Sequence, residues 1–323
     1  GSSRASRPRL LAMAALIDEF AISDDPQGEL SERLRKIQTN LSTAKEEKLE
    51  LIQFLKNHKI RKPELVVKYG LQLIDAYQSH LGDDVWDMIE DVLISSLDIG
   101  NEQLAYDMYT RLDGKFKKPE GSIRLDRLKA RIREFRGEYD RATKIYLSIL
   151  SRDETNKHAY RRLACVAKAK GDPAGTVDAL NEYLKIFPGD LEGWLELAEV
   201  YTSLERYEYV KFCYEEAILI EPHDYRFPLL YADALYSLGQ QKRKTNMKDP
   251  IETAKTYYIQ ALELCPGNIR ALLGLAMCIR YLKVTPQTQK LFEWIEKEVT
   301  KAYAKAGSGG RNMLQYVLKA LRQ

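Results

Sequence analysis

A pattern of apolar and small residues recurs about every 34 residues along the middle of the chain, and it is most regular at residues 191–224. Counted from Leu191, this segment has Trp194 at position 4, Ala198 at position 8 and Pro222 at position 32. Side chains three and four residues apart share one face of a helix, so positions 4, 7, 8 and 11 indicate a first helix and positions 20, 24 and 27 a second. The small residue at position 8 allows the two helices to approach closely, and the proline ends the second helix.

The same frame continues on both sides of this segment. Gly137 and Gly171 occupy the turn at position 15, and an alanine stands at position 8 in successive repeats, at Ala130, Ala164, Ala198, Ala232 and Ala276. This order and spacing are those of the tetratricopeptide repeat (TPR). Such repeats bury their apolar faces against their neighbours and grow by stacking. The sequence therefore predicts an all-α TPR α-solenoid, a superhelix with flanking N- and C-terminal helices.

The chain divides into four expected parts. Residues 1–28 are expected to be irregular, with residues 1–3 left from cloning and Met13 as the native start. Flanking helices follow at 29–85, including an amphipathic helix at 29–57 that either packs on the first repeat or docks a partner. The repeats occupy 86–282. Residues 283–323 are expected to form capping helices, the first with an apolar stripe made of Leu291, Trp294, Ile295, Val299 and Tyr303, and a short final one at 312–321.

A basic, polar insertion, QQKRKTNMKDP at residues 240–250, interrupts one repeat between its two helices. Insertions in repeat proteins fall on loops, and loops often carry binding. A solvated loop with no binding role is the alternative interpretation.

Several functional classes find no support in the sequence. The net charge of +3 and pI near 8.4 are too mild to indicate nucleic-acid binding. The four cysteines form no CxxC pair, which suits free thiols in a reducing compartment. No stretch approaches the roughly 18 apolar residues of a membrane helix. The four histidines lack partners at ligand spacing, and no nucleotide-binding or nucleophile motif occurs, so we expect no metal, no cofactor and no enzymatic activity.

The hollow side of a solenoid is where binding is expected. Positions 2, 5, 9 and 12 of each first helix should face it, and its N-terminal half is then cationic. The predicted partner-binding groove consists of Arg124, Arg127, Arg131, Arg161, Lys168, Glu199, Asp233, Tyr236, Arg270 and Arg280. Guanidinium groups bind carboxylates in a bidentate manner, so an acidic segment with apolar anchors is the expected guest. In that case alanine at these arginines should weaken binding with little loss of stability. The alternative is that the arginines pair with acids of neighbouring repeats.

The repeats also resemble a known family, that of subunit 2 of the endoplasmic reticulum (ER) membrane protein complex. The resemblance covers about residues 60–282. It is carried by LGDDVW at 81–86, NEYL at 181–184 with Phe187, Gly189 and Asp190, WLELAEVY at 194–201 and RALLGL at 270–275.

The resemblance implies a function that the spacing alone does not. It implies a non-catalytic scaffold, peripheral on the cytoplasmic face of the ER membrane, in a complex that inserts tail-anchored and multi-pass proteins. The implied partners are cytosolic parts of subunits 3 and 5 and the soluble subunits 8 and 9. A general TPR adaptor that binds acidic peptides in the cytosol or nucleus is the first alternative, and an RNA-binding helical repeat is the second.

Overall fold

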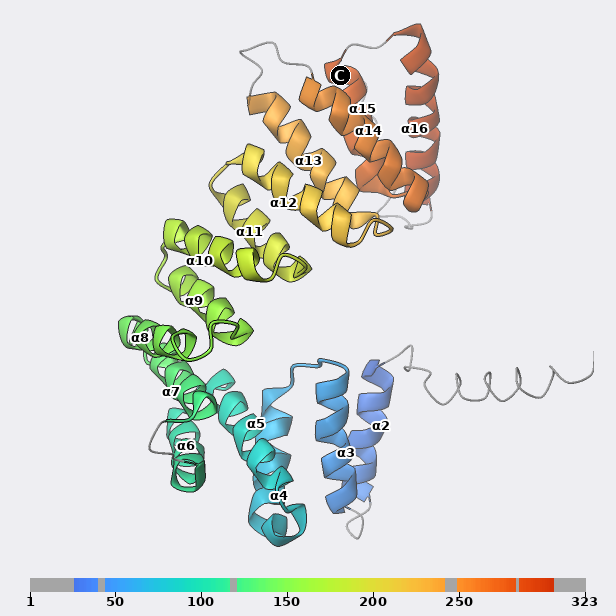
Figure 1. Ribbon diagram of the computed structural model, residues 1–323. Coiled ribbons are helices and arrows are strands. Elements are labelled where there is room, and N and C mark those ends of the chain that lie inside the picture. The colour runs from blue at the N-terminus through green and yellow to red at the C-terminus, as the bar shows by residue number, and fades with distance from the viewer. Residues whose placement is uncertain (1–25, 40–43, 117–120, 242–248, 283–284, 305–323) are drawn as a thin grey trace, which may run out of the picture. The chain divides into compact units, whose positions relative to one another are not determined.

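The computed structural model describes residues 26–39, 44–116, 121–241, 249–282 and 285–304 (Figure 1). Within these ranges every regular element is a helix. The chain divides into two compact units, Gly1–Ile145 and Tyr146–Gln323, and the boundary falls within one helix. The predicted all-α fold is confirmed.

The first unit contains the flanking helices and the first repeats. Its elements are α2 (Pro26–Thr39), α3 (Ala44–Asn57), α4 (Pro63–Leu81), α5 (Asp84–Asp98), α6 (Glu102–Phe116), α7 (Ile123–Phe135) and the start of α8 (Tyr139–Leu150). One helix was expected at 29–57, but two are present, α2 and α3, which pack against each other; α2 already begins at Pro26, within the segment that was expected to be irregular. Leu51 of α3, Leu73 of α4 and Leu93 of α5 are fully buried in one core. The flanking helices therefore share a core with the repeat that follows them.

The second unit continues the helix pairs to the end of the described chain. Its elements are the end of α8, then α9 (Lys157–Ala169), α10 (Pro173–Ile186), α11 (Leu191–Ser203), α12 (Tyr207–Ile220), α13 (Arg226–Gln241), α14 (Asp249–Leu264), α15 (Ile269–Tyr281) and α16 (Pro286–Ala304). Helices adjacent in the sequence pack together from α9 to α16, and Figure 1 shows them following one another as short hairpins. The insertion predicted at 240–250 is shorter at both ends than expected, because α13 runs to Gln241 and α14 begins at Asp249; residues 242–248 are outside the described ranges.

The alanines at position 8 mark the contacts between paired helices. Ala130, Ala164, Ala198, Ala232 and Ala276 all have no exposed surface. A larger side chain there would push the helices apart, because buried cores are close-packed. The repeat frame that was inferred from alanine spacing is the frame of the structure.

The capping helix differs from the prediction at one residue. In α16, Ile295 and Val299 are fully buried against α15, as expected. Trp294, however, is 44% exposed. Successive residues of a helix are turned by about 100°, so the neighbour of a buried isoleucine need not share its face. The final helix expected at 312–321 lies outside the described residues.

In three consecutive repeats the turn at position 15 uses left-handed backbone, although only two of them have glycine there. Gly137 has φ 73° and Gly171 has φ 71°, and in the repeat that begins at Leu191 the same turn holds Glu205 at φ 55°. Only glycine adopts this conformation without steric cost. Glu205 is therefore a strained residue at a position where the preceding repeats have glycine.

Replacing Glu205 with glycine should stabilise the protein. Relief of the left-handed strain, set against the greater freedom of glycine in the unfolded chain, leaves a gain of about 0.5–1 kcal/mol. The midpoint of chemical unfolding should rise. The matched change Gly171→Ala should lower it, and a fall for Glu205→Gly would contradict this account of the turn.

Candidate partner-binding surface

The predicted groove residues all lie on the first helices of the repeats. Arg124, Arg127 and Arg131 are on α7 in the first unit. The second unit carries Arg161 and Lys168 on α9, Glu199 on α11, Asp233 and Tyr236 on α13, and Arg270 and Arg280 on α15. The structure brings most of them together in small groups, in which cations of one first helix bind carboxylates of an adjacent first helix.

In the first unit, Arg124 and Arg127 of α7 are bound to carboxylates of α5. Arg124 bonds to both Asp87 and Glu90, and Nη2 of Arg127 donates to Oε1 of Glu90 at 2.6 Å. Glu90 is only 7% exposed, and a buried carboxylate needs such partners to remain charged. Arg131 forms no ion pair with any residue that the structure describes. The hydrogen bonds to Asp87 and Glu90 raise the pKa of Arg124.

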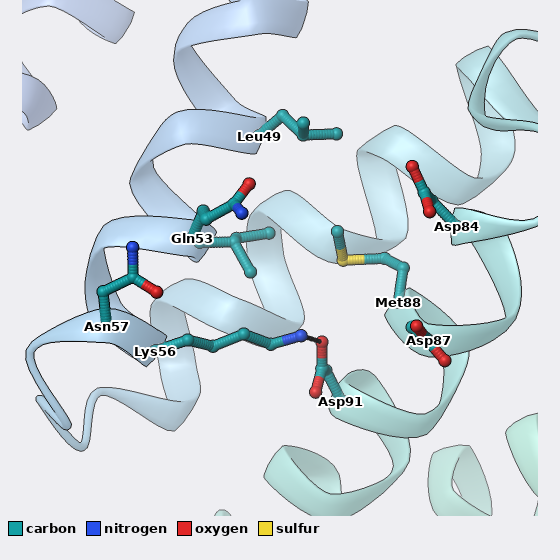
Figure 2. A pocket seen from close by; sticks show the side chains of 9 residues that line it. Leu49, Gln53, Lys56, Asn57, Asp84, Asp87, Met88 and Asp91 are labelled. Carbon is teal, nitrogen blue, oxygen red and sulfur yellow. Dashed lines mark ion pairs between the residues drawn. The ribbon is translucent and has the colours of Figure 1, made fainter.

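Helix α5 also lines a small cavity together with α3. Figure 2 shows Asp84, Asp87 and Asp91 of α5 facing Lys56 of α3 across a cavity of about 220 Å³, and Lys56 pairs with Asp91. Burial raises the pKa of the Asp91 carboxyl, and the hydrogen bond and charge of Lys56 oppose that rise. Asp91 of α5 is thus matched by a cation of α3, and Asp87 and Glu90 by Arg124 of α7.

The second unit repeats this arrangement between α9 and α11. Nη1 of Arg161 lies 2.8 Å from Oε2 of Glu192, and Nζ of Lys168 lies 3.2 Å from Oε2 of Glu199. These hydrogen bonds raise the pKa of Arg161 and of Lys168, so both side chains stay ionised. Glu199, predicted to meet a guest, is engaged by Lys168 instead.

A third group joins α13, α14 and α15. Arg270 lies 2.5 Å from Oδ2 of Asp233, and the hydroxyl of Tyr258 donates to Oδ1 of Asp233 at 2.6 Å. Tyr258 is 2% exposed, and its burial beside Asp233 raises its pKa. Asp233 is therefore a structural acceptor between three helices. Tyr236, also on α13, packs at the edge of the core in this region, and burial raises its pKa.

The residues that pair in this way are 31–37 positions apart, which is close to one repeat. Among the described residues, ion pairs thus link the first helices α5 to α7, α9 to α11 and α13 to α15. This pairing is the one that the alternative interpretation of the sequence described, and it involves Arg124 and Arg127 of α7 and Arg161 and Lys168 of α9. It also revises the expected tolerance of Arg127 to alanine, since removing it would leave buried Glu90 with fewer partners.

The buried carboxylate of Glu90 should matter for stability. Glu90→Gln removes the charge that receives two guanidinium groups, and the loss of charge-assisted hydrogen bonds should cost about 1–3 kcal/mol. Thermal unfolding of the variant measures this loss of stability. Glu102→Gln is the control, because Glu102 pairs with Arg136 at an exposed site where about 0–1 kcal/mol is expected. Equal effects of the two changes would argue against a buried role for Glu90.

Two of the four cysteines, Cys213 and Cys278, are buried free thiols. Burial raises the pKa of Cys213 and of Cys278 to about 12, so both thiols stay protonated near neutral pH. Within the described ranges, no group of three or more His, Cys, Asp or Glu side chains could hold a metal ion. No helix in that part of the chain is long and apolar enough to cross a membrane.

Stacked helix pairs with a buried alanine at each contact define a TPR protein of the α-solenoid class. The C-terminal part of a TPR repeat-containing protein from Cytophaga hutchinsonii shares this fold, with a TM-score of 0.54 at 14% identity over 77% of this chain and 97% of that one. Residues 120–244 match the family model described as the EMC2 TPR-like repeat domain.

Two relatives narrow the class to one family. The chain is 35% identical over 255 residues to ER membrane protein complex subunit 2 of Xenopus tropicalis, covering 76% of this chain and 82% of that protein. It is 31% identical over 275 residues to the protein of the same name from Dictyostelium discoideum, covering 79% and 83%. The chain belongs to the ER membrane protein complex subunit 2 family, and the resemblance found in the sequence is confirmed.

Proposed function

We propose that this protein is a non-catalytic scaffold subunit of the ER membrane protein complex. In this role it sits at the cytoplasmic face of the ER membrane and supports insertion of tail-anchored and multi-pass proteins. It holds cytosolic segments of membrane subunits 3 and 5 and binds the soluble subunits 8 and 9. The observation that carries the proposal is the 35% identity to a relative that is itself named as subunit 2 of that complex.

The charge pairing supports a scaffold. Ion pairs link α5 to α7, α9 to α11 and α13 to α15, and each restrains one repeat relative to the next. An acidic guest would compete with Glu192 and Glu199 for Arg161 and Lys168, so binding there would gain less than at unpaired cations. The adaptor alternative is therefore weakened at Arg161 and Lys168, whose carboxylate partners lie within the chain.

Co-purification tests the proposal. The full-length chain, carrying an affinity tag and expressed in its own cell type, should be recovered from detergent-solubilised membranes together with several membrane-embedded subunits. Recovery of the chain only as a soluble monomer would overturn the proposal. An acidic peptide that bound the isolated chain tightly, and lost binding on Arg161→Ala, would instead favour the adaptor.

A further inference from the structure

A groove lies between the second helices of two consecutive repeats, on a surface that the predicted site did not include. It is a cavity of about 1020 Å³ lined by α10, α11 and α12. Trp194 and Leu197 of α11 are buried at its base, whereas Tyr209 and Phe212 of α12 are 56% and 51% exposed. The groove is therefore apolar at its base and along one wall.

The aromatic side chains of the groove are held in place by one another. Phe212 meets Trp194 edge-on with ring centres 5.8 Å apart, and Tyr209 stacks on Tyr201 at 4.9 Å. The indole Nε1 of Trp194 also donates to the carbonyl oxygen of Pro188 at 2.8 Å, which ties α11 to the end of α10. Pre-organised aromatic surface of this kind loses little conformational entropy when a partner binds.

The repeat fold does not require these exposed apolar residues. Tyr209, Phe212 and Leu219 stand at positions 19, 22 and 29 of their repeat. The two preceding repeats have polar residues or glycine at those positions, namely Arg141, Lys144 and Ser151 in one and Gly175, Asp178 and Lys185 in the other. Leu219 is 75% exposed. A stripe of exposed apolar side chains that the preceding repeats lack is typical of a binding surface.

The rim of the groove is acidic. Asp178 and Glu182 of α10 and Glu216 of α12 line it together with one cation, Lys185. Nζ of Lys185 lies 2.5 Å from Oε1 of Glu182, so that pair is neutral. Asp178 and Glu216 have no ion-pair partner among the described residues. The groove therefore presents two uncompensated carboxylates, one on each side of an apolar base.

We propose that this groove binds an amphipathic helix of another polypeptide, one with an apolar stripe bordered by Lys or Arg. The lining residues of α10 and α12 each follow the i, i+3, i+4, i+7 spacing of a helix face, and the stretch from Tyr209 to Leu219 spans about 15 Å. A partner helix of two to three turns fits that length and would place its apolar side chains on Phe212. Its flanking cations would meet Asp178 and Glu216, whose charge disfavours an acidic peptide or an anionic lipid surface.

A pair of synthetic helical peptides tests the proposal on the full-length chain. Both carry the same apolar stripe, but one is flanked by lysines and the other by glutamates. The lysine peptide should bind at least about tenfold more tightly, and the preference should shrink at high salt, because charge complementarity acts through screened interactions. Equal affinity for both peptides would overturn the proposal.

Variants distinguish binding in the groove from non-specific binding to exposed apolar surface. Phe212→Lys and Tyr209→Arg introduce the residue types that an earlier repeat has at the same positions, where Lys144 corresponds to Phe212 and Arg141 to Tyr209. Folding should therefore be unchanged, whereas peptide binding should fall about tenfold or more. Asp178→Asn combined with Glu216→Gln should abolish the preference for the basic peptide. Trp294→Lys, which changes an exposed apolar residue on α16, is the control and should leave binding intact. Full binding by Phe212→Lys would contradict the proposal.

The partner can be identified in the assembled complex. A photoreactive phenylalanine analogue at position 209 should cross-link to a net-basic helical segment of a different chain. A cross-link to a second copy of this chain, or to its own residues 1–25 or 305–323, would overturn the proposal. This inference rests on the proposed scaffold function, because it assigns one of its docking surfaces. The experiments distinguish failure of the groove proposal from failure of the scaffold proposal. If the chain is a scaffold that uses another docking surface, the Phe212→Lys variant will still co-purify with the complex, and the unchanged chain will bind the two peptides equally.

Discussion

Gly274→Ala should destabilise the protein by about 2–4 kcal/mol, the largest effect of a single methyl group that we expect in this chain. Gly274 lies on α15 and faces the ring of Tyr258, which is 2% exposed. A Cβ at Gly274 would overlap that ring. The added methyl group must therefore displace a fully packed aromatic side chain.

Displacement of Tyr258 would also disturb polar contacts. The hydroxyl of Tyr258 bonds to Asp233, which in turn pairs with Arg270. Loss of that hydrogen bond adds to the packing strain, and unfolding in denaturant measures the sum. Gly114→Ala is the matched control: Gly114 is an exposed residue of α6 with open space where the methyl group would lie, so alanine there should be neutral or slightly stabilising. Similar behaviour of the two variants would contradict the packing seen around Tyr258.

Ala198→Leu should cost about 1–3 kcal/mol by overpacking the contact between α11 and its neighbours. Ala198 has no exposed surface and lies in the cluster that includes Ala164, Leu197 and Cys213. The larger side chain would force these helices apart or push its neighbours out of their preferred rotamers. Thermal unfolding reports the loss.

Ala169→Leu, at an exposed position near the end of α9, is the control for the Ala198 experiment. It should change stability little, because the larger side chain extends into solvent. If Ala198→Leu unfolded at the same temperature as the unchanged protein, position 8 could not be the inter-helix contact and the repeat frame would be wrong.

The first-helix face of the second unit and the α10–α12 groove differ in what occupies them. The first-helix face is dense with charge, yet Arg161, Lys168 and Arg270 already have carboxylate partners within the chain. The groove carries fewer charges, but Asp178 and Glu216 lack such partners among the described residues. A partner gains more from uncompensated carboxylates beside apolar surface than from ion pairs it would have to break.

The predicted binding residues show what helix periodicity can and cannot predict. It placed Arg124 and Arg127 on one face of a first helix, and both lie on α7. It did not predict that Glu90, on the previous first helix, would receive both guanidinium groups. The sequence does contain acidic residues about one repeat before the arginines, and these could have indicated the ion pairs. Residues one repeat apart meet, however, only when the repeats stack in register.

The sequence by itself determined the helix pairs, the alanine contacts between them and the family, because these depend on local periodicity and on residues in fixed order. Tertiary structure alone decided which charges neutralise one another and which apolar side chains stay exposed. Trp294 and Phe212 look like core residues by type, yet both remain accessible. Burial and ion pairing depend on what a neighbouring helix places opposite a side chain, and that information lies outside any single repeat.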